Sequence, residues 1–171
     1  MKTFRELLNG GDLRSIGKSN EVVTLITDQE SFDNLFSFLF SNKRIVVMRA
    51  ADVIEKITAT SPKYLNKHKK KIFVLSETVT NKELKWHLAL LLPRLQLNEK
   101  ETGIVIEKLT IWALDKKESR IVRVNSMQGL FDLSRENPAL QNNFDQTIRA
   151  LEQENIRSIT ARIKKLKKSS K

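Results

Sequence analysis

Apolar positions along this chain follow the period of an α-helix, and the pattern repeats at a fixed interval. In the segment from Arg44 to Ile57, the residues Ala50, Ile54 and Ile57 fall on one helix face, because side chains three or four apart lie above one another. The same positions recur at steps of thirty-eight residues as Leu88, Leu92 and Leu95 and then as Ser126, Leu130 and Leu133. A recurring helix face is typical of stacked helical repeats. The pattern therefore predicts an all-α array of antiparallel helix pairs, an α-α superhelix.

Helix start signals and prolines divide this array. Three segments have the spacing of a capping box, in which two side chains satisfy each other's backbone amides: Thr27 to Glu30, Thr80 to Glu83, and Asn98 to Glu101. Pro93 cannot donate to the Ala89 carbonyl, so the helix there should kink or end. We expect one domain, residues 1–171, with helix pairs at 29–60, 61–97, 98–137 and 138–168 after an irregular N-terminal cap at 1–28.

Two local features of the first part of this array can be predicted more closely. In the cap, a short helix around Phe4 should end at the turn signal Gly10-Gly11. The helix after Asp28 should then present one broad apolar face to the core: Phe32, Leu35, Phe36, Leu39 and Phe40.

Composition narrows the classes of protein that this chain can belong to. With no cysteine and only two histidines, His68 and His87, disulfides, thiolate metal sites and histidine-rich metal sites are excluded. The N-terminus lacks the apolar region of a signal peptide, and the longest apolar run, Leu88 to Pro93, is far shorter than a membrane span. We therefore expect a cytoplasmic protein without cofactor, metal or membrane contact.

The net charge of +11 comes from two local clusters rather than from one broad face. The first cluster consists of Lys63, Lys67, Lys69, Lys70 and Lys71. The second lies in the C-terminal helix and consists of Arg157, Arg162, Lys164, Lys165, Lys167 and Lys168. Outside these clusters the chain is close to neutral, which weakens a nucleic-acid interpretation. The C-terminal cluster is either a solvated end cap or a patch that binds an acidic partner.

Two segments resemble the second helix of a HEAT repeat, which typically has valine and arginine, then small residues, then leucine. They are Val47 to Ile54, VMRAADVI, and Arg120 to Leu133, RIVRVNSMQGLFDL. The resemblance implies a short, curved right-handed stack whose second helices line the concave side. It also implies a ladder of aspartate and arginine between repeats, which only Asp115 with Arg123 approximates here.

Several residues of the predicted second helices are candidates for binding a partner. Arg44, Lys82 and Arg120 recur at the thirty-eight-residue step, where cations beside helix amides can hold carboxylates or phosphates, although their stems can also simply cover apolar surface. The remaining candidates are Arg49, His87, Arg123 and Trp86. We find no nucleophilic triad and no phosphate-binding glycine loop, and so no catalytic residues.

Two functions fit these observations. The first is a non-enzymatic HEAT-like module that binds another protein, one with an acidic surface, through its concave side. The alternative is a nucleic-acid-binding protein, similar to the HEAT-like DNA alkylation-repair glycosylases. For that alternative Trp86, Arg123 and Asp132 are the nearest candidates for the residues beside the DNA backbone.

Overall fold

The computed structural model describes residues 3–9 and 17–169, and these residues form helices without any β-strand. The predicted all-α fold is therefore confirmed. Contacts divide the chain into two compact units, unit 1 from Met1 to Val74 and unit 2 from Leu75 to Lys171. Helix α5, Lys69–Thr78, begins in unit 1 and ends in unit 2. The single domain expected from the sequence stays a prediction.

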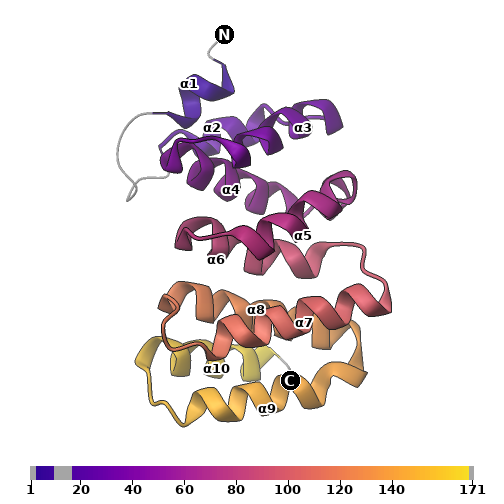
Figure 1. Cartoon of the computed structure of the whole chain (residues 1–171), viewed down its shortest axis with the longest axis vertical. Coiled ribbons are helices and arrows are strands. Elements are labelled where there is room, and N and C mark those ends of the chain that lie inside the picture. Colours follow the sequence, from indigo (N-terminus) through magenta and orange to yellow (C-terminus); the bar gives the residue numbers. More distant parts are fainter. Residues whose placement is uncertain (1–2, 10–16, 170–171) are drawn as a thin grey trace. The chain divides into compact units, whose positions relative to one another are not determined.

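Unit 1 is built around helix α4, Arg44–Thr58, which packs against the other helices of the unit (Figure 1). These are α1 (Phe4–Leu8), α2 (Ser19–Thr24), α3 (Gln29–Ser37), the 3-10 helix η1 (Phe38–Phe40) and the 3-10 helix η2 (Pro62–His68). Val53 and Ile54 of α4 are fully buried. The Gly10-Gly11 turn lies outside the described residues.

Unit 2 is built around helix α8, Arg120–Glu136, which contacts every other long helix of the unit. Its partners are α6 (Lys82–Leu91) with the 3-10 helix η3 (Leu92–Arg94), α7 (Glu99–Leu114), α9 (Gln141–Glu152) with the 3-10 helix η4 (Pro138–Leu140), and α10 (Arg157–Ser169). Figure 1 shows α7 with α8, and α9 with α10, as successive helical hairpins. We call α4, α6, α8 and α10 the second helices and their preceding partners the first helices.

The repeating apolar positions all face the interior of their units. Ala50, Leu88 and Ser126 are each 0% exposed. The other members of the pattern are buried as well: Ile54, Ile57, Leu92, Leu95, Leu130 and Leu133. The thirty-eight-residue interval therefore marks structurally equivalent positions, as predicted.

The helix ends predicted from local signals agree with the structure in some segments and differ from it in others. The capping box of Asn98 and Glu101 is present, and α6 ends at Leu91, two residues before Pro93, as expected. The other two boxes are wrong by one residue, since Asp28 and Asn81 are the N-caps. In both cases the Asp or Asn next to the threonine competes for the same amides and is the N-cap, in line with the preference of N-cap positions for Asp and Asn over Thr.

The end of α3 also differs from the prediction. The α-helix stops at Ser37 and tightens into η1, so that Phe40 leaves the core face and is 54% exposed. A 3-10 turn has three residues per turn rather than 3.6, which rotates the last side chain away from its expected direction. Phe32, Leu35, Phe36 and Leu39 are buried as predicted.

Candidate functional site

The predicted row of cations lies at the start of three second helices. Arg44, Lys82 and Arg120 are the first residues of α4, α6 and α8, and all three are exposed. The positive end of the helix dipole makes a cation in this turn mildly unfavourable. A side chain caps one amide in each of α6 and α8: Asn81 accepts from the Leu84 amide and Ser119 from the Val122 amide. These cations therefore contribute little to helix stability.

Arg123, in contrast, is a buried structural residue of unit 2. It is 2% exposed, and its Nε donates a hydrogen bond of 2.8 Å to the carbonyl of Ala113 near the end of α7. Its guanidinium also pairs with Glu154, just before α10, at 2.7 Å. This hydrogen bond outweighs partial burial and lowers the pKa of Glu154. The predicted pairing of Arg123 with Asp115 is wrong, because the carboxylate that completes the pair lies in the next helical hairpin.

Arg49 has a corresponding structural role in unit 1. It is 1% exposed, and its Nη1 donates hydrogen bonds of 3.1 Å to the carbonyls of both Leu8 and Asn9, at the end of α1. Gly17 passes close to the guanidinium, with a φ of +55°, and a Cβ added there would lie 2.7 Å from Cζ of Arg49. The hydrogen bonds of Arg49 therefore hold the end of α1 against α4.

The remaining candidates on α6 divide between the interior and the surface. His87 is 5% exposed and belongs to the interior of unit 2. Trp86 is half-buried, its ring 5.7 Å from that of His87, and its backbone carbonyl accepts a hydrogen bond of 3.1 Å from Asn125 on α8. Arg49, His87 and Arg123 are buried, so their side chains are not accessible to a partner in this structure. Arg44, Lys82, Arg120 and Trp86 are accessible.

Asp132, a half-buried carboxylate on α8, belongs to a polar network that was not predicted from the sequence. The amide of Gln128 donates to Asp132 at 2.8 Å and accepts from Arg162 of α10 at 2.8 Å. Burial raises the pKa of Asp132, against the hydrogen bond from Gln128 and the positive charges of Arg94, Arg135 and Arg162. Asn125, Gln128 and Asp132 are spaced i, i+3 and i+7, a signal of one polar helix face in the sequence.

The C-terminal basic cluster is mostly exposed on α10. Lys167 pairs with Glu152 at 2.5 Å, and Arg162 is half-buried against Gln128. The other four cations of the cluster are exposed: Arg157, Lys164, Lys165 and Lys168.

Lys67 of the lysine cluster in unit 1 belongs to a hydrogen-bonded group around Asp33. Asp33 accepts hydrogen bonds from Lys67, from Gln29 at 2.8 Å and from His68 at 2.6 Å. Partial burial would raise the pKa of Asp33, but these hydrogen bonds outweigh it and hold the pKa at about 2. Burial lowers the pKa of His68 despite the neighbouring carboxylate.

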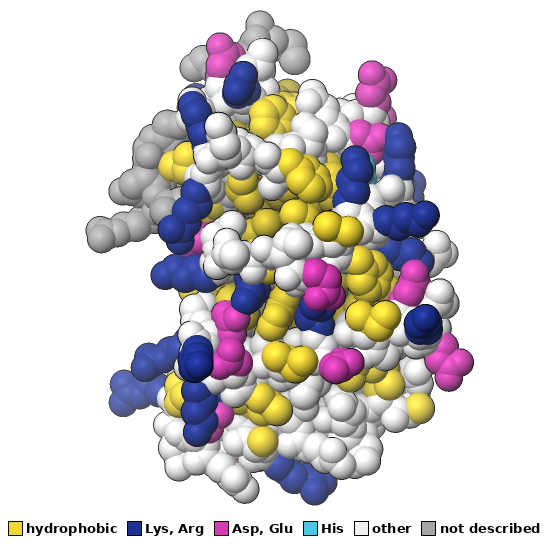
Figure 2. Space-filling view, viewed as in Figure 1, with side chains coloured by type: hydrophobic (Ala, Val, Ile, Leu, Met, Phe, Trp, Pro, Cys, Tyr) yellow, Lys and Arg dark blue, Asp and Glu magenta, His cyan; other side chains and the backbone are white. Residues whose placement is uncertain are grey.

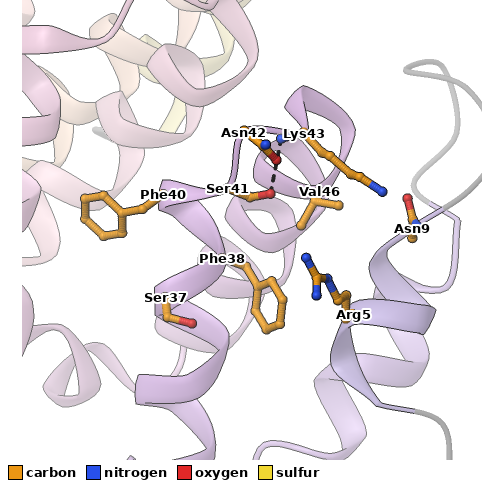
Figure 3. Close-up of a pocket in the computed structure, with 9 residues that line it drawn as sticks. All are labelled: Arg5, Asn9, Ser37, Phe38, Phe40, Ser41, Asn42, Lys43 and Val46. Atoms are coloured by element: carbon orange, nitrogen blue, oxygen red, sulfur yellow. Dashed lines mark hydrogen bonds between the residues drawn. The ribbon is translucent and has the colours of Figure 1, made fainter.

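Lys70 and Lys71 instead line an apolar hollow of about 350 Å³ together with Phe40 and Val74. Phe40 is also among the residues that line a second hollow of about 350 Å³. Figure 3 shows Arg5 beside Phe38 and Val46 in this second hollow, whereas Phe40 points away from it. No sequence signal indicated either hollow, because Phe40 had been assigned to the core.

Paired helices that bury equivalent positions at a constant interval define a helical-repeat protein. The HEAT repeat domain family matches this chain over residues 6–169. The chain belongs to that family. Comparison with curated proteins and with solved structures gives no significant match.

Two further properties concern only the described part of the chain. Within residues 3–9 and 17–169, no helix is both long and apolar enough to cross a membrane. The same residues bring together no group of three or more His, Asp or Glu side chains suited to holding a metal ion.

Proposed function

We propose that this chain is a non-enzymatic HEAT-repeat module that binds another protein through its second helices. The observation that carries the proposal is the contrast between cations of these helices. Arg49 and Arg123 are buried and hydrogen-bonded to the backbone, so the fold accounts for them. Lys82 and Arg120 are exposed at equivalent helix starts, where local electrostatics does not favour a cation. Carboxylates of a partner would account for their recurrence.

Two features of the second helices support this proposal. An exposed cation next to backbone amides is suited to a carboxylate, since both groups donate to its oxygens. On α6, half-buried Trp86 adds an amphipathic contact of the kind that is enriched at protein interfaces. The partner that fits these groups is a protein with an acidic surface.

Quantitative affinity purification tests the proposal, using the full chain as bait in a lysate of the cells that express it. The test variant carries Arg44→Glu, Lys82→Glu and Arg120→Glu. The expected result is a specific protein that is retained by the wild type and lost by this variant. Unchanged retention would remove the cation row from the binding surface.

A matched control distinguishes an effect of the position of the cations from an effect of the net charge of the chain. The control carries Lys63→Glu, Lys100→Glu and Lys117→Glu, which changes the net charge equally at exposed positions outside the starts of the second helices. It should retain the partner. Equal loss in both variants would show that only the overall positive charge matters.

A second candidate function, nucleic-acid binding, is supported by the four exposed cations on α10. The glycosylase-like arrangement is not supported, because Arg123 is held in the interior by Ala113 and Glu154. A salt series with duplex DNA distinguishes the two functions. Phosphate contacts give a logarithmic affinity slope of about −0.9 per neutralised phosphate, so four contacts predict a slope of roughly −4. Absence of binding at low salt would refute this second function.

A further inference from the structure

Phe40 and Val74 form an exposed apolar surface in unit 1. Phe40 is 54% exposed and Val74 is 60% exposed, and the two line one hollow with Lys70 and Lys71. Figure 2 shows hydrophobic side chains uncovered in the region of α5, with charged side chains of both signs around them. Large apolar side chains that share a hollow differ from single exposed ones, because together they offer a contact area from which a partner can displace water.

The Phe40 side chain is only partly packed in unit 1. One neighbouring ring, that of Phe36, lies 6.1 Å away at an interplanar angle of 58°. The rest of the aromatic cluster, Phe32, Tyr64 and His68, packs with Phe36 inside the unit. Part of the Phe40 side chain therefore remains exposed in the hollow that it shares with Val74.

Two cations flank this apolar pair. Lys70 and Lys71 line the hollow that Phe40 and Val74 share, whereas Arg5 and Lys43 line the second hollow, from which the Phe40 ring points away (Figure 3). Neither hollow has an Asp or Glu among its described lining residues. No ion pair joins any of these four cations to a carboxylate within the described part of the chain. The charge complementary to the hollow that Phe40 and Val74 share is therefore negative.

We propose that this surface binds a short acidic segment of a partner protein that carries one apolar anchor residue. We define the Phe40 surface as Phe40, Lys70, Lys71 and Val74. The anchor enters the hollow between Phe40 and Val74, and carboxylates next to it pair with Lys70 and Lys71. This site is separate from the cation row of the second helices, so either proposal can fail without the other.

The chemistry of the surface favours a peptide over other anionic partners. Duplex nucleic acid offers phosphates but no side chain that fills an apolar hollow. A single-stranded nucleic acid can stack a base on an aromatic ring, and a second copy of the chain can cover apolar surface. Both are outcomes that the test below distinguishes.

Selection from a random dodecapeptide library displayed on phage tests the proposal without a known partner. The full chain is the target, and the enriched peptides are then synthesised and titrated by fluorescence anisotropy. Enriched sequences should combine several Asp or Glu residues with one large apolar residue. Phe40→Ala should weaken their binding about tenfold, in line with the loss of one well-buried anchor contact. Lys70→Glu with Lys71→Glu should abolish detectable binding.

Matched variants in unit 2 control for general effects. Ile111→Ala removes a side chain that is 56% exposed, and Lys164→Glu with Lys165→Glu reverses two exposed charges. Both should leave peptide affinity within about twofold of the wild type, since positions remote from an interface contribute little. Val74→Asp serves as a second test variant, because this strongly exposed position leaves the core intact.

Several results would overturn the proposal. They are a selection without enrichment, peptides lacking either acidic or apolar residues, and affinities that do not change in Phe40→Ala and Val74→Asp. Competition by single-stranded DNA that is stronger than that by the peptide would assign the surface to nucleic acid. A concentration-dependent dimer in analytical ultracentrifugation, lost in Phe40→Ala, would assign it to a second copy.

Discussion

The close packing of α8 on α6 at Gly129, and its absence at Gly103, predict opposite effects for the same substitution at these two glycines. Gly129 of α8 lies against the Ala89 carbonyl of α6, and a Cβ added to Gly129 would be 2.6 Å from that oxygen. It would also lie 3.0 Å from Cδ1 of Leu109. Gly103, in α7, has no heavy atom within 4 Å of an added Cβ. The pair therefore separates a packing effect from the helix-forming preference of alanine.

The size of the effect follows from the geometry. An ordinary contact begins at 3.4 Å, so α6 and α8 would have to separate by about 0.8 Å at this point. The obstructing atom is a backbone oxygen, which cannot rotate away as a side chain can. Overpacking of this kind costs about 1–3 kcal/mol, and alanine returns up to about 1 kcal/mol through its greater helix propensity. We expect Gly129→Ala to lower the free energy of unfolding by about 1–2 kcal/mol and Gly103→Ala to raise it by about 0.5–1 kcal/mol.

Urea denaturation followed by tryptophan fluorescence measures both changes. The chain has two tryptophans, Trp86 and Trp112, and both lie in unit 2 together with the two glycines. The signal therefore reports the unit that the substitutions affect. Gly129→Ala as stable as the wild type would refute the close approach of α6 and α8. A loss of stability in Gly103→Ala would refute the assignment of Gly103 to open helix surface.

Three other predictions follow from the buried and titrating groups. Arg123→Met should lower the free energy of unfolding by roughly 2–4 kcal/mol, because it leaves a buried carbonyl and Glu154 without their donor; urea denaturation measures this loss, and one below about 1 kcal/mol would contradict it. Asp33→Asn should remove a part of the stability that depends on pH. The pKa of Asp33 is below its usual 3.8, so the carboxylate stabilises the fold above about pH 4, and this contribution is lost as the pH falls towards 2. Melts from pH 5 to 2 should show a steeper decline in the wild type, and parallel curves would argue against the interaction. Gly17→Ala should destabilise the chain by about 1–2 kcal/mol, since a side chain is strained at positive φ and meets the guanidinium of Arg49; circular dichroism melts measure this, and an unchanged midpoint would count against the contact.

The sequence predicted those features that depend on residues close together in the chain. The burial of Ala50, Leu88 and Ser126 follows from helical periodicity, because a helix fixes which side chains share a face. The end of α6 before Pro93 follows from a missing donor within the same helix. Caps were less certain, since Thr27 and Asp28 compete for the same amides and sequence spacing does not decide between them.

The roles of the arginines depended on distant partners. Arg44 and Arg49 both belong to one helix and carry the same charge, but only the tertiary structure shows that Arg49 reaches the carbonyls of α1 and is buried. Arg123 likewise pairs with Glu154, thirty-one residues away, rather than with the nearer Asp115. The exposure of Phe40 also came only with the structure, through the change from α-helix to 3-10 helix after Ser37.

The sequence by itself therefore determined the helices, their inward faces and the repeat interval, because hydrogen bonding and periodicity within a helix are local. Only the tertiary structure decided which cations are structural and which are accessible, and where an apolar side chain remains uncovered. Burial depends on what other helices bring to a residue, and this information is spread over the whole unit.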